Sequence, residues 1–149
     1  MRTIFKTIAA AKGWGFSYGS RDMINLLENA TPGQIQLLVD VRKRESERSP
    51  DTGLSTGNYI YTGKFLLVVK SDLDEVYDDQ LEVDSSDGKY EKAIQPITTH
   101  LTGALALLED SLICDHDLIV GVWIDLEVTN QLDENMDGVS VTYKLTEVR

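Results

Sequence analysis

The chain has 149 residues, the size of one domain that buries its own core without disulfides or a structural metal. Its 25 acidic and 14 basic side chains give a net charge of −11, and a field of this sign opposes binding to nucleic-acid phosphates or anionic lipids. With one cysteine, Cys114, and a longest apolar run (118–124) far below the roughly 18 residues of a membrane span, we expect a single cytoplasmic domain over 1–149 with no membrane segment.

The N-terminal third is predicted to form two helices around a short extended segment. Apolar residues at helical spacing in 2–12 predict an amphipathic helix that ends at Gly13. Alternating aromatic residues in 14–18 predict a short strand. Ser20 has the character of an N-cap for a second helix, and Thr-Pro-Gly at 31–33 ends that helix.

The next segment reads as a long hairpin. Residues 35–41 alternate between apolar and polar, the pattern of a half-buried strand, and 59–70 form the returning strand. Between them, Gly, Pro, Ser, Asn and Asp predict a long hairpin loop near 46–58. The apolar run inside 59–70 indicates a central strand in the sheet.

An acidic connector near 72–88 separates this hairpin from the main helix. Residues 72–87 hold eight acidic residues and no basic one, which favours an exposed connection. Calcium binding is the alternative, although the carboxylates lack a fixed ligand spacing. Residues 90–113 carry one apolar stripe and predict a long helix, in which Pro96 either causes a kink or marks the first turn.

The chain closes with two predicted strands over 118–148. The first arm places one set of aliphatic side chains on a single face, which we expect to be buried: Val120, Val122, Ile124, Leu126 and Val128. The second arm does the same: Val139, Val141, Tyr143 and Leu145. Asp137 and Gly138 are predicted to close the turn between them. Residues 133–138 also match half of an EF-hand loop, but Lys144 stands where the closing glutamate belongs, so a turn is favoured.

Together these elements predict an α+β fold, a two-layer sandwich. Its mainly antiparallel sheet of about four to five strands is packed by two or three helices.

No pattern in the sequence specifies catalysis. Cys114 and His116 are the best enzymatic candidates, but a helix C-terminus and Asp115 are expected to raise the pKa of the thiol. The glycine-rich segments lack the spacing of phosphate-binding loops. We therefore predict no enzyme activity, no catalytic residue, no cofactor and no metal site.

The interaction surface is predicted on the hairpin. Glutamates interleave with the basic cluster at 42–48, which favours a salt-bridged strand end over nucleic-acid contact. Long polar hairpins outside the core often contact a neighbouring subunit. The expected interaction residues are Arg42, Arg44, Arg48, Leu54 and Tyr59.

The element order resembles the tail terminator and tail-completion proteins of long-tailed bacteriophages. The segments that carry this resemblance are 35–41, 59–70, 90–113, 121–128 and 136–143. It implies a non-enzymatic virion protein that assembles in the host cytoplasm as a ring, about hexameric, at the neck or the end of the tail. Its partners would be copies of itself and other tail or neck proteins, without sequence-specific nucleic acid. The acidic segment and the aromatic strand depart from the family pattern.

Two other classes stay open. One is a small cytosolic protein-binding module that dimerises through sheet edges. The other is an enzyme that uses Cys114 and His116, for which loss of an activity on Cys114→Ala would be the test.

Overall fold

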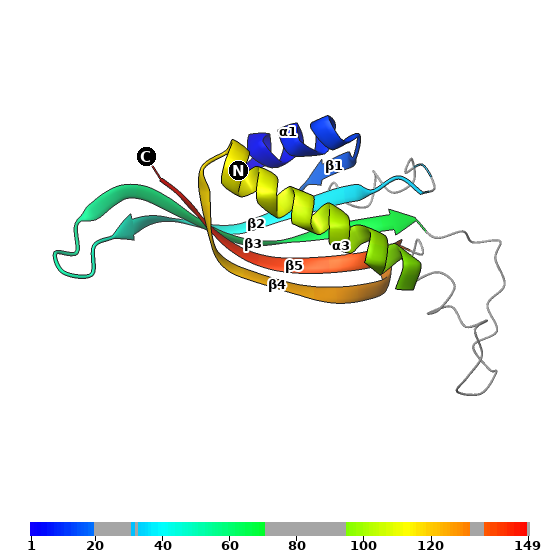
Figure 1. Cartoon of the computed structure of the whole chain (residues 1–149). Helices are drawn as coiled ribbons and strands as arrows, with labels where there is room; N and C mark the ends of the chain where they lie inside the picture. Colours follow the sequence, from blue (N-terminus) through cyan, green and yellow to red (C-terminus); the bar gives the residue numbers. More distant parts are fainter. Residues whose placement is uncertain (20–30, 32, 71–94, 132–135, 149) are drawn as a thin grey trace.

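Among the residues that the structure describes, a five-stranded sheet forms one layer and two helices form the other (Figure 1). The computed structural model describes residues 1–19, 31, 33–70, 95–131 and 136–148. The predicted second helix and the acidic connector lie outside the described residues. The α+β class and the two-layer, mainly antiparallel arrangement are confirmed.

The elements follow the predicted order, with bounds that differ in places. The helices are α1 (Arg2–Lys12) and α3 (Gln95–Asp110), and α3 continues into a π-helical turn, η2 (Ser111–Asp115). The strands are β1 (Gly15–Tyr18), β2 (Gln36–Arg48), β3 (Ser55–Lys70), β4 (Leu118–Gln131) and β5 (Met136–Glu147). Gly13 ends α1 at φ 72°, a left-handed conformation that glycine adopts without steric cost, as the sequence predicts.

The strand order is β1-β2-β3-β5-β4. β1 pairs with β2 in parallel, and every other pairing is antiparallel. The central position of β3 is confirmed, since it lies between β2 and β5. Within the described residues, β1 and β4 are the two edges of the sheet.

The core lies between the helices and one face of the sheet. Three buried aromatic rings, Phe5, Phe65 and Tyr143, occupy its centre, and the partly buried Trp123 packs against them. The Phe65 ring lies within 6.0 Å, centroid to centroid, of each of the other three. The β5 residues that were predicted to share a face are all buried here: Val139, Val141, Tyr143 and Leu145. The long alternation in β5 therefore predicts the helix-covered face correctly.

A second, smaller buried cluster lies on the opposite face of the sheet, named here the open face. It contains Leu38, Leu66, Val68 and Met136. Leu66 and Val68 alternate along β3 with Phe65 and Leu67 of the main core, and successive side chains of a strand point to opposite faces. The open face is therefore buried in part.

Three predictions about the strands need correction. The strands continue into the predicted loop near 46–58, so only 49–54 form the turn. Gly138 does not close a turn, because it lies within β5, where an added Cβ would stand 2.2 Å from the Leu67 carbonyl oxygen and 2.8 Å from Val68 Cα. Close approach of the β3 backbone, rather than a positive φ, explains this glycine.

The third correction concerns β4. A bulge between Val120 and Val122 changes the face to which the side chains point. Trp123 contacts Phe65 of the main core, so Val122 and Ile124, its neighbours along the strand, point to the open face. The aliphatic residues that were expected to share the buried face are therefore divided between the two faces.

Candidate interaction surface

Strands β2 and β3 extend beyond the rest of the sheet as a two-stranded arm, residues 47–58 (Figure 1). The pairing of β3 with β5 ends at Tyr59 and Glu147, whereas β2 and β3 stay paired out to Arg48 and Ser55. A two-stranded hairpin is only marginally stable in water. The arm must therefore be held by its own polar contacts or by contacts to another molecule.

Glu47 joins the two strands of the arm. Its Oε2 accepts hydrogen bonds from Thr56 Oγ1 at 2.8 Å and from Asn58 Nδ2 at 2.7 Å. These bonds, with the Asn58 bond the stronger cause, lower the pKa of the Glu47 carboxyl below its ordinary value. One carboxylate thus links β2 to β3 on the solvent-exposed arm.

The tip of the arm is a tight turn over residues 49–54. Gly53 adopts φ 67°, and its amide donates to the Ser49 carbonyl oxygen at 2.9 Å. Arg48 Nη1 also donates to the Gly53 carbonyl oxygen at 2.9 Å. The turn leaves Leu54 69% exposed, although it is a large aliphatic side chain.

At the base of the arm, an arginine lies against aromatic rings. The Arg44 guanidinium carbon is 3.9 Å from the Tyr59 ring centroid and 5.9 Å from that of Tyr61. Tyr61 in turn donates its hydroxyl to Glu147 Oε2 at 2.8 Å. These contacts hold the base of the arm against the body of the protein.

The predicted interaction residues therefore form two groups on one hairpin. Arg44 and Tyr59 are in contact at the base, while Arg48 and Leu54 belong to the tip. The Arg42 side chain lies outside the part that the structure describes.

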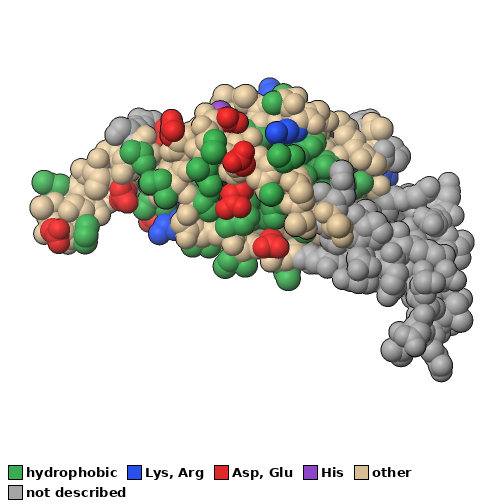
Figure 2. Space-filling model, in the orientation of Figure 1, with side chains coloured by type: hydrophobic (Ala, Val, Ile, Leu, Met, Phe, Trp, Pro, Cys, Tyr) green, Lys and Arg blue, Asp and Glu red, His purple; other side chains and the backbone are tan. Residues whose placement is uncertain are grey.

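A row of exposed aliphatic side chains on β4, named here the β4 row, is a second candidate surface, which the sequence reasoning missed. It consists of Ile119, Val122, Ile124 and Leu126, which are 57%, 36%, 62% and 67% exposed. Figure 2 shows hydrophobic side chains along the lower margin of the body, where β4 runs in Figure 1. Gly121 beside Trp123 was the available signal, because glycine within a strand often marks a bulge.

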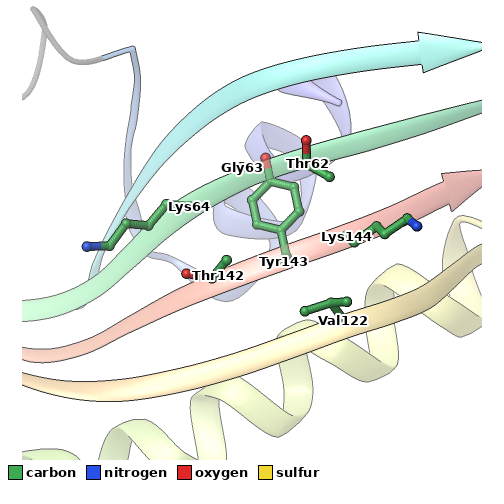
Figure 3. Close-up of a pocket in the computed structure, with 7 residues that line it drawn as sticks. All are labelled: Thr62, Gly63, Lys64, Val122, Thr142, Tyr143 and Lys144. Carbon is green, nitrogen blue, oxygen red and sulfur yellow. The ribbon is translucent and has the colours of Figure 1, made fainter.

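Next to the β4 row, the open face has a shallow hollow of about 260 Å³ across β3, β5 and β4 (Figure 3). Val122 forms one side, and the Lys64 and Lys144 side chains extend from it in opposite directions along their strands. The lining residues are Thr62, Gly63, Lys64, Val122, Thr142, Tyr143 and Lys144. None of these seven is acidic, so the hollow suits a partner with an apolar and an anionic group.

The structure places the enzymatic candidate Cys114 on the surface. Its Sγ lies 3.4 Å from Asp110 Oδ1, and this hydrogen bond, together with the charges of Asp110 and Asp115, raises the pKa of the thiol. The expected direction of the shift is confirmed, with Asp110 as the larger cause. In the described part of the chain, no cluster of three or more His, Cys, Asp or Glu residues is arranged to hold a metal ion.

None of the described helices is long and apolar enough to cross a membrane. Comparisons of the chain with protein-family models, with curated proteins and with solved structures give no match.

Proposed function

We propose that this protein is a structural subunit of a bacteriophage or prophage virion, a tail terminator, neck or tail-completion protein that assembles into a ring of about six copies. The arm is the observation that carries this proposal. It extends two strands away from the core and ends in an exposed leucine. Such an element does little for the stability of a monomer and suits a contact with a neighbouring subunit.

The separation of the arm from the β4 row supports a ring in particular. Both surfaces expose large aliphatic side chains, but they belong to different parts of the molecule. Contacts between unlike patches of identical subunits repeat from one copy to the next, and they close into a ring when the rotation permits. The partners in this proposal are copies of the chain and other tail or neck proteins.

The charge of the chain fits a passage for DNA through such a ring. A net charge of −11 repels a translocating polyanion and keeps it from adhering. Reversing several exposed acidic side chains should then impair genome passage while assembly stays intact. Unchanged infectivity of particles that carry such variants would contradict this part of the proposal.

Size-exclusion chromatography with light scattering, over a range of concentrations, tests the assembly. We expect a closed species of about six subunits, visible as a ring in negative-stain images. A monomer at every concentration would contradict the proposal.

The exposed edge of β4 favours one alternative, a protein-binding module that dimerises through sheet edges. β4 spans 14 residues at one edge of the described sheet and exposes aliphatic side chains. A concentration-independent dimer without higher assembly would favour this alternative over the ring.

A further inference from the structure

We propose that the arm tip of one subunit docks into the hollow beside the β4 row of a second copy of this chain. The inference rests on the proposed ring assembly and names its contact. Leu54 would pack against Val122, and Asp51 would lie between Lys64 and Lys144. The side-chain types and charges of the two surfaces support this pairing.

The tip has an apolar group and an anionic group close together. Among residues 49–54, Asp51 is the one charged side chain, and both Asp51 and Leu54 are exposed. Figure 2 shows hydrophobic and acidic side chains together at the end of the arm. The hydrogen bond from Arg48 to the Gly53 carbonyl oxygen holds the turn, so the two groups are presented together at little cost in conformational entropy.

The hollow offers the matching groups. Val122 contributes apolar surface, which the β4 row continues through Ile124 and Leu126. Lys64 and Lys144 supply the positive charge, and Thr62 and Thr142 supply hydroxyl groups on neighbouring strands. A hollow of about 260 Å³ is large enough for one leucine side chain with a short acidic neighbour.

Geometry excludes the same contact within one chain. Tyr59, Glu147 and Leu118 stand side by side where the five-stranded part of the sheet ends. Leu54 lies five residues beyond that line on the arm, while Val122 lies opposite Lys144, three residues inside it. At about 3.3 Å per residue, the two sites are roughly 25 Å apart along the strands. The occupant of the hollow must therefore come from another copy.

A pairing of two β4 edges would use the same row but is less favourable. Asp125 lies exposed on the edge strand, so an antiparallel pairing that places the two copies of Asp125 opposite each other would bring like charges close together. The arm tip instead brings an acidic group to two lysines. Charge therefore favours the arm tip, rather than a second β4 strand, as the partner of this surface.

Crosslinking of single-cysteine variants tests the contact. Cys114 is exposed and is first replaced by Ser. Leu54→Cys and Val122→Cys are then prepared separately and treated with a short bismaleimide. We expect a crosslinked dimer when the two proteins are mixed and none from either protein alone. Leu107→Cys on α3, which is 50% exposed, is the control in place of Val122→Cys and should give no product with Leu54→Cys.

A chain with both cysteines extends the test. It should give a ladder of crosslinked products that ends at the size of the closed ring. Products from Val122→Cys alone would show that two β4 edges meet, and they would overturn the inference. A ring seen by light scattering without any product between positions 54 and 122 would also overturn it, while leaving the proposed ring intact. A monomer without crosslinks would overturn both.

Charge exchange gives an independent measurement. Asp51→Lys and Lys144→Glu should each weaken assembly about three- to tenfold, read as a shift in the concentration of half-assembly. The double variant should recover part of that loss, because positions 51 and 144 again carry opposite charges while Lys64 then faces a positive charge at position 51. Lys12→Glu, the same charge change at the end of α1, should have no effect. Additive losses in the double variant would contradict a direct pairing of Asp51 with Lys144.

Discussion

The two faces of the sheet differ in how fully they are covered. The helix-covered face forms one continuous core in which α1 and α3 pack over aromatic and aliphatic side chains (Figure 1). On the open face, the buried cluster around Leu66 and Val68 gives way to exposed aliphatic side chains along β4. The first face thus stabilises the fold, whereas the second leaves aliphatic side chains exposed to solvent.

Substitutions should separate these two roles. Changes on the helix-covered face should lower the free energy of unfolding, and changes in the β4 row or the arm should lower assembly at nearly constant stability.

Phe65→Ala should have the largest effect. The ring is 1% exposed and stacks at an angle against Phe5, Trp123 and Tyr143, so its removal leaves a cavity at the centre of the core. We expect a loss of about 3–5 kcal/mol in the free energy of unfolding, measured by urea denaturation. A loss below about 1 kcal/mol would mean that the helices do not cover this face as described.

Gly138→Ala should be the next most damaging change. The added methyl group would stand 2.2 Å from the Leu67 carbonyl oxygen, a backbone atom that cannot rotate away. We expect a loss of about 2–3 kcal/mol, because β3 and β5 must move apart at the centre of the sheet.

Gly103→Ala is the matched control for Gly138→Ala. In α3 an added Cβ meets no heavy atom within 4 Å, so alanine should raise stability by about 0.5–1 kcal/mol through helix propensity. The same substitution should therefore have opposite signs at the two positions. Equal effects would contradict the close approach at Gly138.

The sequence predicts the helix-covered face better than the open face. β5 has an uninterrupted alternation from Val139 to Leu145, and all four of its apolar positions are buried. The helical periodicity of 2–12 likewise predicts α1 correctly. The spacing of apolar residues along the sequence identifies these elements, because each of them buries one face along its full length.

The alternation fails in β4 for a local reason. One extra residue at the bulge near Gly121 changes the face to which the side chains from Val122 onward point, as far as the next irregularity after Val128, and the period of the apolar residues does not reveal it. The sequence therefore predicted as core the same Val122, Ile124 and Leu126 that the structure exposes. Turn-forming residues near 46–58 led to a similar error, because they favoured a loop in a region that is largely strand. β2 continues to Arg48, and β3 begins at Ser55.

Tyr143→Phe should raise stability slightly. The hydroxyl is buried and has no hydrogen-bond partner among the described residues, so its removal eliminates an unsatisfied polar group. We expect a gain of about 1 kcal/mol at neutral pH, measured by urea denaturation. A loss of stability would indicate that the hydroxyl is hydrogen-bonded.

The gain from Tyr143→Phe should increase in alkaline solution. Burial raises the pKa of the Tyr143 hydroxyl, and the charges of Tyr18 and Asp40 raise it further. An unfolded tyrosine releases its proton near pH 10, while the folded protein keeps it, so wild-type stability falls as the pH rises through about 10. Phenylalanine has no such proton. A gain that is independent of pH would contradict the raised pKa.

Ile124→Ser combined with Leu126→Ser should leave the fold nearly unchanged. Both side chains are more than half exposed, so the free energy of unfolding of the monomer should change by about 0.5 kcal/mol or less. Assembly should weaken, because the β4 row loses its two most exposed aliphatic residues. Light scattering checks assembly and urea denaturation checks stability. If assembly is unchanged, the β4 row is not part of the interface between subunits.

Glu47→Gln should have the smallest effect, confined to the arm. The carboxylate accepts two hydrogen bonds across the hairpin, and a neutral amide accepts them more weakly. We expect faster hydrogen exchange at arm amides with unchanged exchange in the body, measured as protection factors. Glu45→Gln is the control, because Glu45 contacts Lys43 of its own strand and does not join β2 to β3.

Acidic solution should reproduce the Glu47→Gln effect in the wild type. The pKa of Glu47 is lowered in the folded arm, so its contribution is present above the ordinary glutamate value and is lost as the pH falls through the lower, folded value. Arm protection in the wild type should fall over that range, whereas Glu47→Gln should change little. If the variant loses protection in parallel with the wild type, a titrating group other than Glu47 holds the arm.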